Sequence, residues 1–268
     1  MNASTSKMIF RMVRCHGKRL PGLWCYVAAS LVLAYYAGSA VPLAKVTGMS
    51  LTEYILYVLT DHYYLIYVWF FFLLYWIVHV VQMNRRQEWI RYGSCRMKYN
   101  VDNLTAVFQL SLMILGNLVL VTLIGLAGVG VSGGFRAARL TEDISGNLTV
   151  LAGYAQIFPG PVPALVCVLL YWDLGCIFLY MMLYYAYHLG GRRAMIVELL
   201  FYIFSTMVGF ITEIDESVLN LFFFNNYYIL HHALLMVGSW AVGINVAVMV
   251  IAWIGMRGMA IWQRKTPT

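Results

Sequence analysis

The sequence predicts an all-α polytopic membrane protein with six transmembrane helices and both termini in the cytoplasm. Of its 268 residues, 62% are hydrophobic and only 11% are charged, whereas soluble domains carry about 25% charged residues. Six apolar runs reach or approach the roughly 20 residues that cross a bilayer as a helix: 23–44, 63–82, 104–131, 162–188, 196–212 and 233–256. The third observation is the distribution of basic residues among the loops.

Lysine and arginine are concentrated on one side of this arrangement. With the N-terminus inside, all but three of the 18 basic residues are cytoplasmic, the exceptions being Lys45, Arg136 and Arg139. The outer loops instead contain most of the acids: Glu53, Asp61, Glu142, Asp143, Glu213, Asp215 and Glu216. Because positively charged loops remain in the cytoplasm, the split predicts an N-in, C-in topology. The net charge of +7 therefore reflects orientation and does not indicate nucleic-acid binding.

Residues 5–19, before the first apolar run, form a basic amphipathic segment. Four basic residues recur at helical spacing: Lys7, Arg11, Arg14 and Lys18. Such a helix lies in the headgroup region of the cytoplasmic leaflet, although a plain topological anchor has the same composition. The loop 45–62 after the first run is predicted to be a short outer loop.

The stretch 84–99 (NRRQEWIRYGSCRMKY) joins the second and third runs and carries five basic residues. Glu88 can pair with Arg85 or Arg91 across one helical turn, and Trp89 and Ile90 offer apolar contacts. We predict a cytoplasmic helical element that can dock a partner; an ordinary basic loop is the alternative. Asp102 and Asn103 are predicted to cap the third span.

The second half of the chain contains two predicted hairpins. The loop 189–195 is so short that 162–188 and 196–212 should form a tight helical hairpin, after the longer outer loop 132–161. Residues 213–232 begin with acids and then become apolar, with Phe222, Phe223 and Phe224 in succession. We predict a helical hairpin that dips into the outer leaflet; an interfacial aromatic belt is the alternative.

Three polar residues are predicted at mid-membrane depth: Asp173, Asn117 and Asn245. A carboxylate there costs about 2.5–3.5 kcal/mol on insertion scales, so Asp173 should face the helix bundle. These residues could line a polar pathway or hold helices together through hydrogen bonds.

The sequence contains no pattern that indicates catalysis or a cofactor. The six histidines are scattered: His16, His62, His79, His188, His231 and His232. Adjacent residues on a helix point about 100° apart, so His231 and His232 are not expected to hold one metal together. No P-loop is present for ATP. We therefore expect a non-catalytic chain without a metal or cofactor of its own.

A short motif follows the second run: Arg91, Tyr92, Ser94, Arg96 and Tyr99 match an R-[FY]-x-S-x-[KR]-x-x-[WY]-like pattern, with Lys98 and Cys95 as departures. With this motif and the element order above, the chain resembles the membrane subunits of ABC exporters of the type-2 permease class. It is most similar to small bacterial permeases of peptide or bacteriocin transport and self-immunity systems.

The resemblance implies a division of labour. A separate ABC ATPase, in two copies, would bind ATP and Mg and dock on 84–99, with these coupling residues: Arg85, Arg86, Glu88, Trp89, Ile90, Arg91, Tyr92, Ser94 and Arg96. A second permease, identical or related, would complete the pathway, and the first, second and fifth spans would meet there. The substrate would be an amphipathic peptide, an antibiotic or a lipid, exported across a bacterial plasma membrane.

Two other function classes are compatible with the sequence. One is an accessory or assembly protein, or a transporter that does not use ATP. The other is a membrane enzyme acting on lipid, with Asp173 or the histidines as catalysts.

Overall fold

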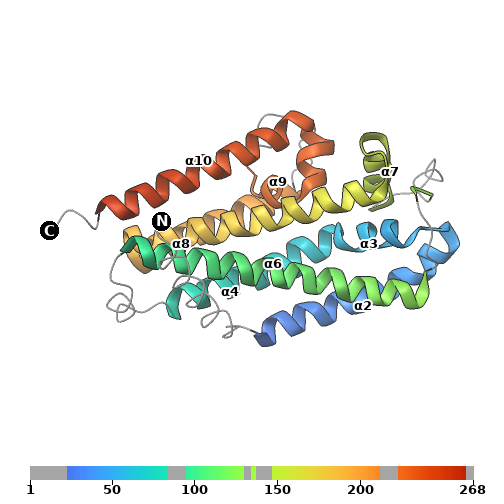
Figure 1. Cartoon of the computed structure of the whole chain (residues 1–268), viewed down its shortest axis with the longest axis horizontal. Coiled ribbons are helices and arrows are strands. Elements are labelled where there is room, and N and C mark those ends of the chain that lie inside the picture. The colour runs from blue at the N-terminus through green and yellow to red at the C-terminus, as the bar shows by residue number, and fades with distance from the viewer. Residues whose placement is uncertain (1–22, 84–94, 130–133, 137–146, 212–222, 264–268) are drawn as a thin grey trace, which may run out of the picture.

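The computed structural model describes residues 23–83, 95–129, 134–136, 147–211 and 223–263 (Figure 1). Within these ranges the protein is helical, without strands. Five helices are long and apolar enough to cross a membrane: Leu23–Thr47, Tyr64–Gln82, Arg96–Gly128, Pro161–Gly209 and Ser239–Trp262. The all-α prediction is therefore confirmed, and the helices are those of a membrane protein. The predicted amphipathic segment 5–19 lies outside the described residues.

The predicted outer loop 45–62 contains a buried helix, so the prediction of a short loop is wrong. Helix α2 (Leu23–Thr47) is followed by α3 (Leu51–Leu59). The Ser50 hydroxyl accepts a hydrogen bond from the Glu53 amide at 3.2 Å, and the Glu53 carboxylate accepts one from the Ser50 amide at 2.8 Å. This reciprocal capping box starts α3. The π-helix η1 (Tyr64–Trp69) and helix α4 (Phe70–Met83) follow.

Helix α6 (Cys95–Gly128) begins inside the predicted coupling segment rather than at residue 104. Asp102 and Asn103 consequently lie within the helix, and the prediction that they cap it is wrong. Both side chains are buried. Their partners come from α6 itself and from α8, as described below.

Helix α8 (Pro161–Ile211) is interrupted at Gly191, whose φ of 70° and ψ of −161° lie in a region open only to glycine. If α8 were straight, Gly175 and Gly209 would be about 50 Å apart at 1.5 Å per residue. Instead, Gly175 packs against the Tyr227 carbonyl and Gly209 against the Asn225 side chain, on either end of the four-residue helix α9 (Asn225–Tyr228). The two arms of α8 therefore run antiparallel.

The remaining described elements surround this helical hairpin. Helix α7 (Asn147–Ile157) occupies part of the predicted outer loop 132–161. The predicted outer hairpin 213–232 is described only from residue 223, as α9 and the residues around it. The π-helix η5 (His232–Val237) follows, and Gly238, with φ 120°, separates it from α10 (Ser239–Gln263). The sixth predicted run, 233–256, is thus divided between η5 and α10.

The direction of each helix relative to α6 follows from residue pairs in contact. Asp102 bonds to Tyr184 and Ser111 to Asp173, so the first arm of α8 is antiparallel to α6. The α3–α4 run is also antiparallel to α6, since Tyr54 packs on Gly125 and Tyr64 bonds to Asn117.

Helices α2 and α10 complete an alternating pattern. Tyr26 bonds to the Met113 carbonyl and Ser30 to Asn117, so α2 is parallel to α6. Asn245 bonds to Tyr171, while Arg257 further along α10 reaches Asn100 at the start of α6. Hence α10 is parallel to the first arm of α8. Successive long passes of the chain alternate in direction (Figure 1).

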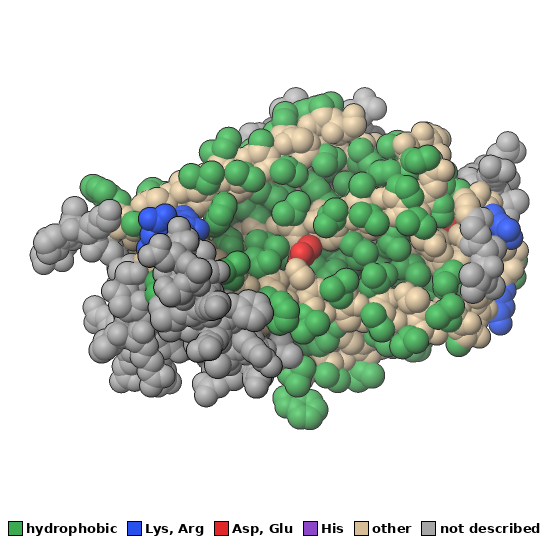
Figure 2. All heavy atoms as spheres, in the orientation of Figure 1, with side chains coloured by type: hydrophobic (Ala, Val, Ile, Leu, Met, Phe, Trp, Pro, Cys, Tyr) green, Lys and Arg blue, Asp and Glu red, His purple; other side chains and the backbone are tan. Residues whose placement is uncertain are grey.

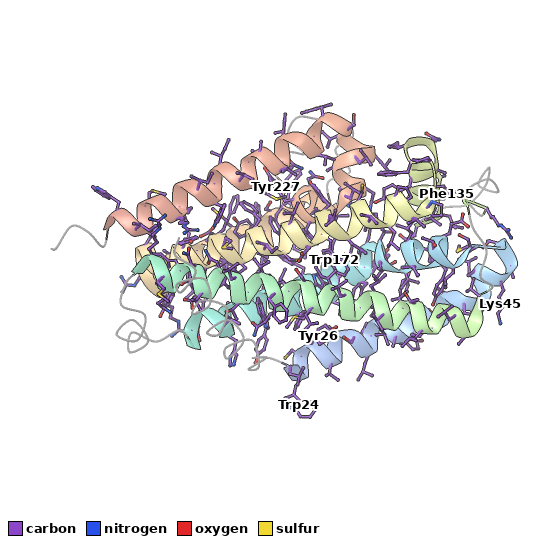
Figure 3. All side chains as sticks on the ribbon, viewed as in Figure 1. Trp24, Tyr26, Lys45, Phe135, Trp172 and Tyr227 are labelled. Carbon is purple, nitrogen blue, oxygen red and sulfur yellow. The ribbon has the colours of Figure 1, made fainter. Side chains whose placement is uncertain are left out.

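One end of the bundle, here called the basic end, comprises the start of α6, the turn of α8 and the last turns of α10. Tyr99 of α6 contacts the His188 ring beside that turn at 5.5 Å between centroids. This end carries most of the described basic residues: Arg96, Lys98, Arg192, Arg193 and Arg257. Lys45 lies at the opposite end (Figure 3).

Candidate functional site

The predicted coupling segment is mostly outside the described residues. Of its named members, Arg85, Arg86, Glu88, Trp89, Ile90, Arg91, Tyr92 and Ser94 all lie in the gap between α4 and α6. Arg96 is described, in the first turn of α6, and its side chain is exposed. Because α4 and α6 are antiparallel, the end of α4 and the start of α6 that flank this gap both lie at the basic end of the bundle.

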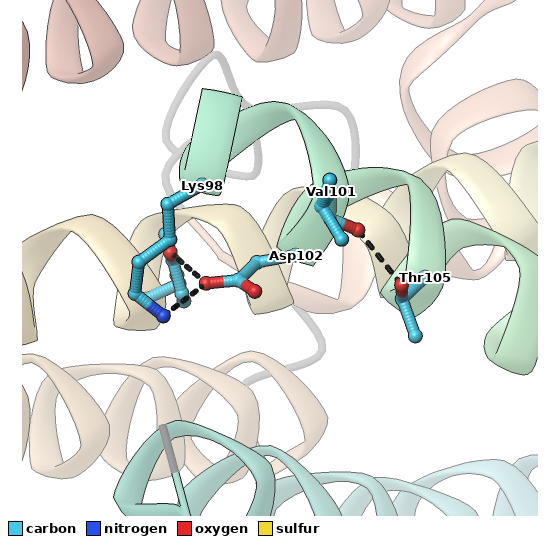
Figure 4. A network of polar contacts seen from close by, with 5 residues as sticks. Lys98, Val101, Asp102 and Thr105 are labelled. Atoms are coloured by element: carbon cyan, nitrogen blue, oxygen red, sulfur yellow. Dashed lines mark hydrogen bonds and ion pairs between the residues drawn. The ribbon is translucent and has the colours of Figure 1, made fainter. Parts of the chain in front are cut away.

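A buried ion pair follows this segment directly. The Lys98 ammonium contacts the Asp102 carboxylate at 2.8 Å, with side-chain exposures of 0% and 4% (Figure 4). The Tyr184 hydroxyl of α8 donates to the same carboxylate oxygen at 2.5 Å. Buried charges are tolerated when they are paired and hydrogen-bonded. This pair was not among the predicted site residues, although lysine and aspartate four residues apart at a helix start are a usable signal.

The same end of α6 is tied to two more helices. The Asn103 amide donates to the Tyr185 hydroxyl at 2.7 Å, and the Arg257 guanidinium of α10 donates to the Asn100 side-chain oxygen. The first two turns of α6 are thus bonded to both α8 and α10.

Asp173 has a different environment from the one predicted. It is half-buried rather than enclosed by the bundle, and its neighbours Leu170 and Leu174 are 60% and 44% exposed. Figure 2 shows an acidic side chain in the middle of an apolar face. One carboxylate oxygen accepts from the Ser111 hydroxyl at 2.7 Å, while Oδ1 has no hydrogen-bond partner among the described residues.

Asn117 and Asn245 are fully buried. Neither is bonded to Asp173 or to its partner Ser111. The Asn117 amide donates to the Tyr64 hydroxyl at 3.2 Å and joins α6 to η1. The Asn245 amide donates to the Tyr171 hydroxyl at 2.9 Å and to the Asn226 carbonyl at 2.8 Å, joining α10 to α8 and α9. The three polar residues are not brought together, and a role in a pathway stays a prediction.

Of the predicted hairpin phenylalanines, Phe222 lies outside the described residues, Phe223 is half-buried and Phe224 is buried. The Phe224 amide donates to the Ser205 hydroxyl at 2.9 Å, and its ring contacts Tyr202 at 4.8 Å between centroids. Phe178 of the opposite α8 arm also contacts this ring. The described part of the segment is therefore packed between both arms of α8 (Tyr227 in Figure 3).

Three histidines that are far apart in the sequence converge beside this segment. His62 lies between α3 and η1, and His231 and His232 lie at the start of η5. One ring nitrogen from each lies within 4.8 Å of the other two, and the Nε2 atoms of His62 and His231 are 2.5 Å apart. These residues could hold a metal. The three histidines look scattered in the sequence, because 169 positions separate His62 from His231.

Burial favours the neutral form of these imidazoles. Burial lowers the pKa of His232 to about 3 and holds the pKa of His231 well below its usual range. Burial also lowers the pKa of His62, with the nearby Asp61 carboxylate opposing the shift. Neutral imidazole is the form that binds metal ions.

Asp61 belongs to a polar network next to the histidines. Its carboxylate accepts hydrogen bonds from the Tyr36 hydroxyl at 2.6 Å, from the Asn147 amide at 2.7 Å and from the Tyr64 backbone at 2.7 Å. The network holds α2, η1 and α7 together and fixes the chain on the N-terminal side of η1.

Comparison with known proteins adds no relative: no family model, curated protein or solved structure matches this chain.

Proposed function

We propose that this chain is the membrane subunit of an ATP-driven exporter of the ABC type, with ATP and Mg bound by a separate ATPase. The observation that carries the proposal is the alternation of six helical passes, in which α8 supplies two arms. Such a chain crosses a bilayer six times when each arm spans it. A permease of the class that the sequence resembles has the same element order.

The proposed orientation is N-in and C-in in a bacterial plasma membrane. It is supported by the basic end, which carries most of the described lysines and arginines, since cytoplasmic loops are rich in these residues. The start of α6, the turn of α8 and the end of α10 would then face the cytoplasm. An ATPase would approach this end.

Coupling would proceed through residues 84–99. An ATPase that pushes on this segment moves the first turns of α6, and the Asp102–Tyr184 and Asn100–Arg257 hydrogen bonds transmit that movement to α8 and α10. A loosely attached loop could not transmit a displacement in this way. The hydrogen bond from Tyr184 to the buried Asp102 carboxylate is thus a mechanical link in the proposed cycle.

A second permease, identical or related, is the proposed partner within the membrane. The half-buried Asp173 side chain lies on an apolar face with the Ser111 hydroxyl as its hydrogen-bond partner, and charged groups at membrane depth normally pair with protein groups. This face is formed by α6 and the first arm of α8. It differs from the face of spans one, two and five that the resemblance implies.

Native Cys167 tests this face, because it is exposed and lies on the same side of α8 as Leu170 and Leu174. Oxidative cross-linking in native membranes is expected to give a disulfide-linked dimer that is lost in Cys167→Ser. If the dimer forms only through a cysteine introduced at the exposed Phe204, on the second arm, the interface lies on that arm instead.

The proposed substrate is an amphipathic peptide, an antibiotic or a lipid-like molecule. The support is the aromatic lining between the arms of α8, where Phe178, Tyr202 and Phe224 meet. Movement of the described hairpin segment against these rings would open an apolar path.

The decisive experiment begins with purification from the native host in a mild detergent and mass spectrometry of bound proteins. A stoichiometric P-loop protein is expected. Simultaneous replacement of Glu88, Trp89 and Arg91 by alanine should abolish transport and the stimulation of the P-loop protein's ATPase activity. Expression and topology should not change. The matched control is Arg192→Ala with Arg193→Ala, which removes basic charge from the same end outside 84–99. Unchanged ATPase stimulation in the triple variant would contradict the docking proposal.

A membrane enzyme acting on lipid is the second candidate function, and the convergence of three histidines favours it. That function requires activity from this chain alone, lost in His232→Ala or Asp173→Asn. A chain that purifies without an ATPase and turns over lipid would replace the transporter proposal.

A further inference from the structure

The two π-helices of the described chain both adjoin the histidine cluster. η1 begins two residues after His62, and η5 begins at His232 itself. π-Helices make up well under 1% of residues in proteins and are frequent at functional sites. Their coincidence at one cluster indicates that the backbone is adapted to present these side chains.

We propose that His62, His231 and His232 bind one first-row transition-metal ion, with Zn²⁺ as the expected ion. Imidazole nitrogens suit zinc, copper and nickel, and a three-histidine set leaves a fourth position for water or another ligand. The proposal does not depend on the transport function.

The spacing of the nitrogens fits this proposal. Zn–N bonds of about 2.0–2.1 Å in a tetrahedral site place ligand nitrogens about 3.3 Å apart. The nitrogens that could serve here are 2.5 Å apart for the closest pair and at most 4.8 Å apart for the set. A metal therefore needs shifts of about 1 Å, which side-chain rotation provides.

Within the described chain, one of the candidate ligand nitrogens makes no hydrogen bond. His232 Nε2 is buried and has no hydrogen-bond partner there. An unpaired buried polar atom costs about 1–3 kcal/mol, and a bound metal ion removes that cost for each nitrogen that ligates it. The Asp61 carboxylate interacts electrostatically with His62 and adds negative charge near the cation.

A metal at this cluster would join two separate parts of the fold. His62 belongs to the connection between α3 and η1, whereas His231 and His232 belong to the connection between α9 and α10. The ion would clamp η5 against the second helical pass. It would thereby restrict the segment that packs between the arms of α8.

The test uses the full-length chain, purified in detergent, stripped with chelator and titrated with Zn²⁺ or Co²⁺. One ion per chain is expected, with Co²⁺ giving the visible absorption of a tetrahedral site. His232→Ala should weaken Zn²⁺ binding at least about tenfold, a loss of about 1.4 kcal/mol. His79→Asn is the matched control, since the half-buried His79 ring stacks on Tyr75 away from the cluster, and it should bind normally.

A conservative variant keeps the test valid if alanine disturbs folding. His62→Cys replaces one nitrogen by a thiolate, and its Co²⁺ complex is expected to gain a sulfur-to-cobalt charge-transfer band. Absence of stoichiometric binding by the wild-type chain would overturn the proposal. Binding that is equal in wild type and in all cluster variants would also overturn it, because the ion would then lie elsewhere.

Discussion

Asp102 of α6 and Asp173 of α8 each accept a hydrogen bond from the other helix, yet they differ in burial and in the number of their partners. Asp102 is buried, with a lysine at 2.8 Å and a tyrosine hydroxyl at 2.5 Å. Asp173 is half-buried among exposed leucines, with one serine partner and one oxygen without a partner in the described chain. The difference separates a carboxylate that the chain pairs with an ammonium group and a hydroxyl from one that it pairs with a hydroxyl on an apolar face.

Removing Asp102 should produce the largest effect on stability. Asp102→Leu removes the carboxylate that contacts the buried Lys98 ammonium at 2.8 Å, and breaking a buried pair in this way costs about 3–5 kcal/mol. The free energy of unfolding in mixed micelles measures the loss. The double variant Lys98→Met with Asp102→Leu should recover most of it, because a buried pair can be replaced by apolar residues. A double variant as unstable as the single one would show that the ion pair is not the cause.

Removing one hydrogen bond to Asp102 should have an intermediate effect on the free energy of unfolding. Tyr184→Phe deletes one hydrogen bond to a charged group, which costs about 1.5–3 kcal/mol, and keeps the ring contacts with Tyr99 and Tyr180. The same unfolding assay tests this value. If the exporter proposal holds, coupling between ATP hydrolysis and transport should weaken as well. Unchanged stability would show that Lys98 alone satisfies Asp102.

Replacing Asp173 should have the smallest effect on the isolated chain. Asp173→Leu loses the Ser111 hydrogen bond but removes a carboxylate from an apolar face, and these terms of about 1.5–3 and 2.5–3.5 kcal/mol nearly cancel. We expect a change of about 1 kcal/mol or less in unfolding, together with a clear loss of Cys167 cross-linking. Ser111→Ala serves as the control and should leave cross-linking intact. A large destabilisation by Asp173→Leu would mean that the residue is structural.

Sequence reasoning predicted the features that depend on local composition. Apolar length predicts a membrane helix directly, and the tight connection at 189–195 predicted the hairpin that turns at Gly191. Sequence reasoning did not predict the helix starts and burial that depend on tertiary contacts. Helix α3 looks like loop because its start is set by two residues, Ser50 and Glu53, and its burial comes from packing on α6 and α8.

The candidate sites were harder to predict than the helices. Asp102 looked like a helix cap because the earlier start of α6 is fixed by partners on α8 and α10. The histidine cluster depends on residues from two connections that only the fold brings together. Asp173 was assigned to the bundle interior because depth in a helix can be read from the sequence, whereas the direction of a side chain around the helix axis cannot.

The non-helical Gly191 at the turn of α8 has a consequence for how the protein is made. With only Gly191 outside helical geometry, the two arms have no slack to separate. In the proposed six-pass arrangement we therefore expect them to enter the bilayer together. A substitution at Gly191 would therefore act first on biogenesis, as a reduced yield of inserted chain, before it altered any property of the mature protein.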